Sequence, residues 1–189
     1  TDQIGPDHAA SWLTDLPQST PVSLYVHVPF CRQICWYCAC NMKLAGSDVP
    51  LLTYASDLLH EIKLVAATLP RSAQVVRVHW GGGTPTILPP DIIHRLAGAV
   101  KAVIPPTDDW EFSVEIDPTM VDRAKIAALA DEGMNRASIG IQDFDPLAFA
   151  NGQTAHPRIG INCQMEPFRQ IADLRFDPRW SQAKRGQSL

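Results

Sequence analysis

Residues 23–40 read SLYVHVPFCRQICWYCAC, a short alternating segment followed at once by a loop that carries four cysteines. The alternation of apolar and polar residues over 23–28 predicts a β-strand. Further strands are predicted at 74–80, 111–116 and 136–142, and helices at about 50–69, 92–103 and 119–132. The helix at 119–132 is expected to stop at Gly133. The order β-α-β-α-β-α-β predicts a parallel sheet with right-handed crossovers.

Each predicted strand has one apolar and one polar face, which is unusual for a parallel sheet covered on both sides. The apolar face, on which the helices should pack, contains Leu24, Val26, Val28, Val76, Val78, Trp80, Phe112, Val114, Ile116, Ala137, Ile139 and Ile141. The polar face contains Tyr25, His27, Arg77, His79, Ser113, Glu115, Ser138, Gly140 and Gln142. A partial (β/α) barrel of about four parallel strands would turn this polar face inward around a wet cavity.

The cysteine loop has the spacing C-x3-C-x2-C over Cys31, Cys35 and Cys38. Three thiolates from one short loop can hold three irons of a four-iron cluster and leave the fourth iron open. Structural zinc is the main alternative, but Cys40 as a fourth ligand would give an awkward spacing for a tetrahedral site. Unligated thiols are a further alternative. Such clustering indicates a metal or redox centre in a reducing compartment.

The composition is that of a globular protein, with 46% hydrophobic and 19% charged residues among 189. No apolar run reaches the roughly 18 residues of a membrane span, and no basic segment opens a secretory signal. The net charge of −4 divides into −7 for residues 1–150 and +3 for residues 151–189. Because neither part has a clustered basic surface, we expect neither a nucleic-acid partner nor a membrane.

Four stretches together resemble the radical S-adenosylmethionine domain of oxygen-independent coproporphyrinogen III oxidases (dehydrogenases). They are LYVHVPFC at 24–31 with the cysteines that follow, HWGGGTPT at 79–86, VEIDP at 114–118 and SIGIQDF at 138–144. The resemblance implies a 4Fe-4S cluster and S-adenosyl-L-methionine, whose reductive cleavage gives a 5′-deoxyadenosyl radical. It also implies the oxidative decarboxylation of two propionates of coproporphyrinogen III to the vinyls of protoporphyrinogen IX, in heme biosynthesis.

The resemblance also assigns site residues, although the catalytic residues stay unknown. The cluster ligands would be Cys31, Cys35 and Cys38, and the S-adenosylmethionine contacts would be Tyr25, Tyr37, Gly82, Gly83, Thr84, Glu115 and Gln142. Other readings stay open: Tyr37 as a core aromatic, the glycines as a tight turn, and Glu115 with Gln142 as a solvated pair. His27 and His79 either orient the cluster or cofactor or bond to nearby backbone. Arg77 either offsets carboxylate charge or pairs with an acidic neighbour.

The residues after the third ligand separate two branches of the family. A related heme-trafficking branch usually has aspartate and phenylalanine there, whereas this chain has Ala39, Cys40 and Asn41. The enzyme branch is therefore favoured, with a heme-binding relative and an inactive remnant as alternatives. The family further implies a porphyrinogen substrate, an electron donor such as flavodoxin or ferredoxin, a monomer and a cytoplasmic location.

The chain departs from the family after about residue 146. The family has about six β/α units and a helical C-terminal domain, but only four strands are recognisable here. We expect an N-terminal extension at 1–21, part of the radical domain at 22–146 with the cluster loop at 29–41, and an irregular, unrelated tail at 147–189. As a truncated fragment, the chain alone should cleave the cofactor slowly at most and form no vinyl product.

Overall fold

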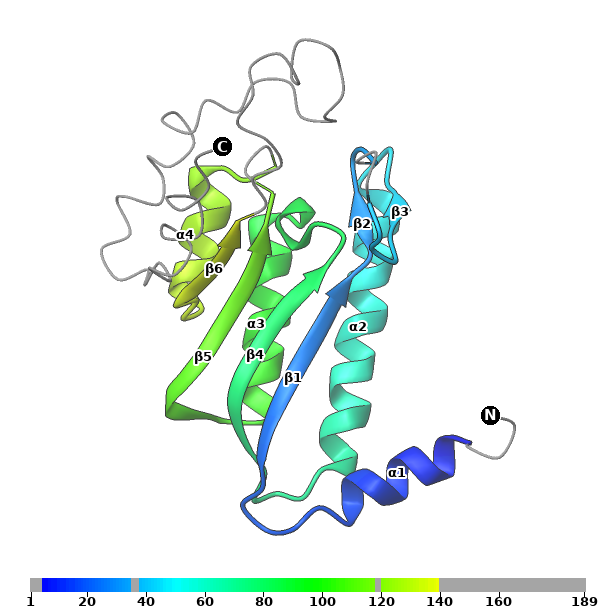
Figure 1. Ribbon diagram of the computed structural model, residues 1–189, viewed down its shortest axis with the longest axis vertical. Helices are drawn as coiled ribbons and strands as arrows, with labels where there is room; N and C mark the ends of the chain where they lie inside the picture. The colour runs from blue at the N-terminus through cyan, green and yellow to red at the C-terminus, as the bar shows by residue number, and fades with distance from the viewer. Residues whose placement is uncertain (1–4, 35–37, 118–119, 140–189) are drawn as a thin grey trace, which may run out of the picture.

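The computed structural model describes residues 5–34, 38–117 and 120–139 (Figure 1). Its main sheet has four parallel strands in the order β1-β4-β5-β6, which is also their order along the chain. The strands are β1 (Pro21–Val28), β4 (Gln74–Gly82), β5 (Pro106–Ile116) and β6 (Arg136–Ile139). The expected α/β fold with four parallel strands is confirmed.

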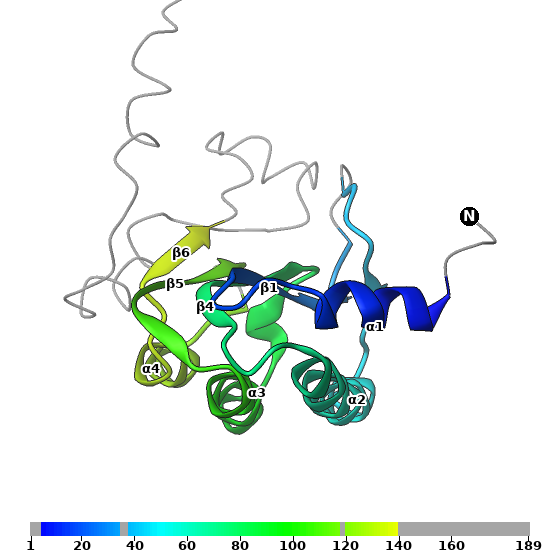
Figure 2. The ribbon, with the colours of Figure 1, turned by 90° about the horizontal axis from the view of Figure 1, so that it is seen from below.

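Three helices connect these strands and lie side by side against one face of the sheet, as Figure 2 shows. They are α2 (Val49–Thr68), α3 (Pro90–Val103) and α4 (Arg123–Asp131). In the described part of the chain, no helix combines the length and the apolarity that a membrane span needs.

The core lies between the sheet and these helices, on the strand face predicted to be apolar. The strands bury Val26, Val28, Val78, Trp80, Phe112, Val114 and Ile116 there, and Ala137 and Ile139 are partly buried against the same core. The helices contribute Leu51, Leu58, Ile93, Leu96, Ile126 and Leu129, among others. Removing one such side chain from water stabilises the fold by about 1.5–3 kcal/mol, so this face fixes which side of each strand remains polar.

One apolar position was predicted wrongly. Val75 is fully buried, whereas Val76 is only partly buried. The pairing of β4 with both neighbouring strands shifts register between Val75 and Arg77, so an extra residue interrupts the alternation. Such a bulge reverses the face of the residues that precede it, which a strict period of two does not anticipate.

Three element boundaries also differ from the expected ones. Strand β5 begins at Pro106, five residues before the expected 111, and β1 begins at Pro21. Helix α4 begins at Arg123, later than the expected 119, because the side chain of Asp122 accepts a hydrogen bond from the backbone of Lys125 and caps the helix. Gly133 follows this helix with φ +93°, and the expected glycine stop is confirmed.

Four small elements complete the described structure. Strands β2 (Phe30–Cys31) and β3 (Lys43–Leu44) form a separate parallel pair, and η1 (Pro85–Ile87) is a single 3-10 turn. Helix α1 (Pro6–Thr14) lies in the extension at 1–21, for which no helix was predicted. The Thr14 hydroxyl lies within hydrogen-bond distance of the Thr68 carbonyl at the end of α2. The expected residues 140–142 of the last strand lie outside the described residues.

A polar cluster holds α3 to the end of α4. Glu132, the C-cap of α4, accepts hydrogen bonds from Nζ of Lys101 at 2.5 Å and from Nδ1 of His94 at 2.8 Å. Burial raises the pKa of Glu132, but the hydrogen bonds and charges of Lys101 and His94 outweigh burial and hold it below the ordinary 4.5. The ionised carboxylate therefore stabilises the folded chain.

We expect Glu132→Gln to lower the free energy of unfolding by about 1–2 kcal/mol at neutral pH, because the amide cannot accept both bonds as an anion does. A depressed folded-state pKa contributes stability that is present above the unfolded-state value and is lost as pH falls through the folded-state value. The difference from wild type should therefore shrink below about pH 4.5. Urea unfolding across this pH range measures it.

The adjacent exposed carboxylate gives the control. Asp131→Asn should change stability by less than about 0.5 kcal/mol. A Glu132→Gln effect that does not vary with pH would contradict the ionic account.

Candidate metal and cofactor site

The cysteine loop (29–41) follows the carboxyl end of β1, and the glycine loop (81–86) begins at the carboxyl end of the neighbouring strand β4 (Figure 1). Beyond the strands, the backbone N–H of Gly83 donates to the carbonyl of Val28 at 2.9 Å. The N–H of Thr84 donates to the carbonyl of Phe30 at 2.8 Å. These bonds continue the pairing past the sheet. They hold the glycine loop against the start of the cysteine loop.

The two ends of the cysteine loop are tied together at its base. The backbone N–H of Ala45 donates to the carbonyl of Cys31 at 3.0 Å within the β2–β3 pair. The guanidinium of Arg32 donates to the carbonyl of Ala45 at 2.7 Å and forms an ion pair with Asp48 at the start of α2. The base of the loop is thus fixed by bonds that involve no thiol.

Three of the cysteines can be placed. Cys31 is half-buried, while Cys38 and Cys40 are exposed, and none of the three is in a disulfide. Burial raises the pKa of the Cys31 thiol, the hydrogen bond with Thr84 opposes this, and the charges of Cys38 and Asp117 raise it further. Burial also raises the pKa of Cys40, and the charge of Cys38 raises it further. The thiols therefore lie close enough to disfavour one another's ionisation, and a bound cation would relieve this.

The third predicted ligand, Cys35, lies outside the described residues, as do Tyr37 and Gln142. The described residues alone contain no group of three or more histidine, cysteine, aspartate or glutamate side chains arranged to hold a metal ion. The roles of Cys35, Tyr37 and Gln142 stay predictions.

The polar face of the sheet carries a connected set of side chains next to these loops. The Tyr25 ring stacks on His79 with centroids 5.7 Å apart, and its hydroxyl lies 3.0 Å from Nδ1 of His27. Nε2 of His79 lies 3.3 Å from Glu115, and Nε2 of His27 lies 3.1 Å from the carbonyl of Asn41. Strand residues are thereby linked both to one another and to the end of the cysteine loop.

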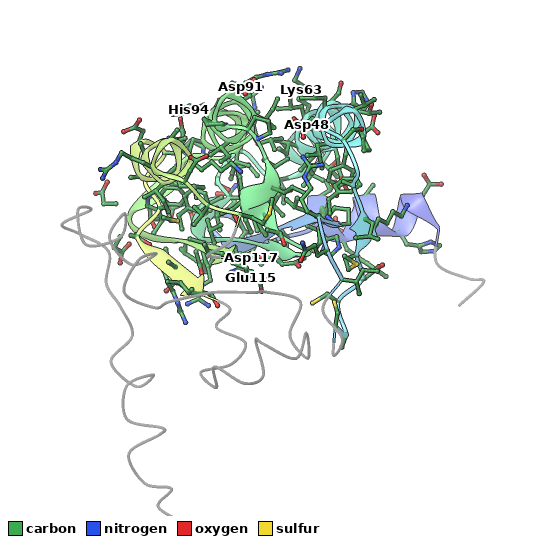
Figure 3. All side chains as sticks on the ribbon, turned by 90° about the horizontal axis from the view of Figure 1, so that it is seen from above. Asp48, Lys63, Asp91, His94, Glu115 and Asp117 are labelled. Atoms are coloured by element: carbon green, nitrogen blue, oxygen red, sulfur yellow. The ribbon has the colours of Figure 1, made fainter. Side chains whose placement is uncertain are left out.

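Glu115 lies on the side of the sheet opposite helix α3, which carries Asp91 and His94, as Figure 3 shows. It also accepts a hydrogen bond from the backbone N–H of Gly82 at 3.2 Å. The pKa of Tyr25 is raised by burial first, and then by the charges of Glu115 and Cys40. The cysteine loop and the carboxylate therefore face the same polar surface.

The glycines at the end of β4 and directly after it make close approaches to neighbouring residues. A Cβ on Gly82, whose φ is +114°, would lie 2.6 Å from the His27 ring, and one on Gly83 would lie 2.7 Å from the carbonyl oxygen of Phe30. A Cβ on Gly81 would lie 3.0 Å from the Glu115 carboxylate. The lack of side chains lets the backbone approach both the histidine and the cysteine loop.

The structure brings together many of the site residues that the resemblance assigns. Cys31, Cys38, Gly82, Gly83, Thr84 and Glu115 lie at or beyond the carboxyl ends of β1, β4 and β5, and Tyr25 lies within β1, stacked on His79. Arg77 instead forms an ion pair with Glu111 on the neighbouring strand, with Nε 3.2 Å from the carboxylate, which agrees with the acidic-neighbour reading.

Sequence reasoning missed three supports of the site. The Tyr54 hydroxyl donates to the carbonyl of His27 at 2.7 Å, and Arg32 ties the base of the cysteine loop. Nζ of Lys125, whose pKa is lowered by burial, donates to the carbonyl of Thr86 at 2.8 Å. Tyr54 and Lys125 lie in segments whose periodicity predicts helices. This periodicity predicts which residues pack against the sheet, but it does not predict these hydrogen bonds.

The described residues fit an iron–sulfur cluster with a bound cofactor beside it. The donors are soft thiols on a loop whose base is closed, which suits iron–sulfur or zinc in preference to a hard cation. The glycine backbone and the carboxylate of Glu115 form the adjacent surface, and a Cβ on Gly82 or Gly83 would collide with the His27 ring or the Phe30 carbonyl.

Comparison with known proteins agrees with this reading. The family model of the radical SAM superfamily matches residues 25–176. The chain therefore belongs to the radical SAM superfamily.

Among curated relatives, the chain is 55% identical over 144 residues to "Coproporphyrinogen III oxidase, anaerobic 1" of Cereibacter sphaeroides, a match covering 76% of the chain and 32% of the relative. It is 46% identical over 146 residues to the oxygen-independent coproporphyrinogen III oxidase of Paracoccus denitrificans, covering 77% and 32%. The chain thus spans about a third of the length of these relatives.

Among solved structures, the chain superposes with a TM-score of 0.79 and 30% identity on coproporphyrinogen III oxidase (HemN) from Escherichia coli, described there as a radical SAM enzyme. The match covers 90% of this chain and 39% of that one. The similarity extends from motifs to the three-dimensional arrangement of the elements.

We expect Gly82→Ala to destabilise the chain by more than about 1 kcal/mol, because the new Cβ would meet the His27 ring at 2.6 Å and φ +114° disfavours alanine. Thermal unfolding measures the loss.

Gly98, inside α3 with open space around its Cβ position, is the matched control. Gly98→Ala should stabilise by about 0.5–1 kcal/mol, because glycine is a poor helix former. Equal effects of the two substitutions would show that the close approach at Gly82 is not a constraint.

Proposed function

We propose that this chain carries the cluster-binding and cofactor-binding part of an oxygen-independent coproporphyrinogen III oxidase. The observation that carries the proposal is the 55% identity over 144 residues to a protein of that name. The reaction would be the oxidative decarboxylation of coproporphyrinogen III to protoporphyrinogen IX in heme biosynthesis. The cysteine loop and the glycine loop at the carboxyl ends of the strands support this proposal, because sites in parallel α/β folds form there.

In this proposal Cys31, Cys35 and Cys38 bind a 4Fe-4S cluster and leave one iron for S-adenosylmethionine. When bound, the reduced cluster would supply the electron that cleaves that cofactor. Gly82 and Gly83 leave room for the methionine part against their backbone, and the Glu115 carboxylate accepts hydrogen bonds from the ribose hydroxyls. Tyr25, Tyr37, Thr84 and Gln142 complete the predicted contacts.

The proposed partners follow from the same similarity. The substrate is a porphyrinogen, and the one-electron donor is a protein of the flavodoxin or ferredoxin class. We further propose a monomer in the cytoplasm. The relatives' names support the substrate, while the donor and the oligomeric state rest on the family resemblance alone.

We expect the chain, after anaerobic reconstitution with iron and sulfide, to bind about four irons per chain, because three thiolates of one loop match a four-iron cluster. Reduction should give a paramagnetic resonance signal, and added S-adenosylmethionine should change it. Iron analysis and paramagnetic resonance spectroscopy measure both.

Other outcomes separate the alternatives. Stoichiometric zinc without a cluster spectrum would contradict the proposal. Heme binding without cofactor cleavage would support the heme-trafficking relative, and neither binding nor cleavage would indicate an inactive remnant.

We expect Cys40→Ala to keep the iron content and Cys35→Ala to lose most of it. Only one residue separates Cys40 from Cys38, and a fourth thiolate on the open iron would block the cofactor. The two variants are matched, because each removes one thiol from the same loop. Equal iron losses in both would contradict the ligand assignment.

A further inference from the structure

The hydroxyl of Thr84 is directed at the sulfur of a proposed cluster ligand. Its Oγ1 lies 3.2 Å from Sγ of Cys31, although the two residues are 53 positions apart in the chain. Thr84 is 5% exposed and Cys31 is half-buried, so the threonine side of this contact is shielded from water. The hydrogen bond is part-buried, which makes it stronger than one fully exposed to water.

The backbone N–H and carbonyl of Thr84 both take part in other hydrogen bonds. Its N–H donates to the carbonyl of Phe30, and its carbonyl accepts from the N–H of Ile87 in the turn η1. A threonine before a helical turn usually caps that turn with its side chain, but the Thr84 hydroxyl makes no capping bond. The side chain therefore remains available for the sulfur.

The direction of the hydrogen bond follows from the chemistry of the ligand. In the free thiol, either atom can be the donor. A cysteine that binds iron is a thiolate without a proton, so Thr84 must then donate to the sulfur. A donor aimed at a cluster sulfur stabilises the more negative, reduced cluster more than the oxidised one, and so raises the reduction potential.

We propose that Thr84 is a positioning residue that acts through Cys31: its hydroxyl donates to Sγ and makes the cluster easier to reduce. This inference rests on the proposed function, because it requires a cluster on Cys31. The cluster takes one electron from a one-electron donor of the flavodoxin or ferredoxin class, which is oxidised by one electron. No covalent bond forms or breaks, and Thr84 keeps its proton throughout.

Thr86 provides a matched control two residues further on. It is fully buried, and its Oγ1 has no hydrogen-bond partner within the described structure. Replacing each threonine by valine removes one hydroxyl at nearly constant shape. Only the change at Thr84 removes a hydrogen bond to a ligand sulfur.

The test is a potentiometric titration of the reconstituted 189-residue chain, followed by paramagnetic resonance, with dithionite as reductant. At the wild-type midpoint, Thr84→Val should lower the ratio of reduced to oxidised cluster about tenfold, which corresponds to 59 mV for one electron. Thr86→Val should leave this ratio unchanged. Equal ratios in wild type and Thr84→Val, or equal shifts in the two valine variants, would overturn the inference.

A second pair of variants decides the question if Thr84→Val does not hold a cluster. Thr84→Ser and Thr84→Ala both lack the methyl group and differ only by the hydroxyl. The serine variant should keep a ratio of reduced to oxidised cluster near that of wild type, and the alanine variant should show the lowered ratio. Equal ratios in this pair would overturn the role of Thr84 alone. Absence of any cluster from the wild-type chain would overturn the proposed function and this inference with it.

Discussion

The arrangement of the site depends on two backbone hydrogen bonds, from Gly83 to Val28 and from Thr84 to Phe30. They extend the pairing of β1 and β4 beyond the point where both strands end. Because a Cβ on Gly83 would lie only 2.7 Å from the carbonyl oxygen of Phe30, only glycine permits this approach. The cysteine loop and the glycine loop therefore occupy fixed positions relative to each other, and Thr84 reaches Cys31 as a consequence.

The fold was largely predictable because its strands differ so clearly between their two faces. Alternation identified the buried apolar residues of β1 and β5 correctly, although Ser113, expected on the polar face, is also buried, and Gly133 marked the end of α4. The error at Val75 and Val76 arose where β4 changes register, since a bulge is fixed by pairing with neighbours. The nine-residue helix α1, within the expected N-terminal extension, was not predicted because it is shorter than the window over which helical periodicity becomes clear.

The site was predictable where its residues are close together in sequence, and less so where they are not. The spacing of the cysteines and the run of three glycines are local patterns. In contrast, the contact between Thr84 and Cys31 joins residues 53 positions apart, and the support of His27 by Tyr54 joins residues 27 apart. Sequence periodicity cannot predict contacts between residues so far apart in the chain. They arise only when the sheet brings the ends of its strands together.

The electrostatics of the site oppose the addition of an electron. The polar surface beside the thiols carries Glu115, and the charge of Asp117 already disfavours ionisation of Cys31. Arg77, the strand cation predicted on the same face, pairs with Glu111. Nearby negative charge disfavours each further negative charge, so this environment would hold the potential of a cluster low. A low potential would suit the proposed transfer of an electron from the cluster to S-adenosylmethionine. The hydrogen bond proposed from Thr84 would act in the opposite direction and raise that potential.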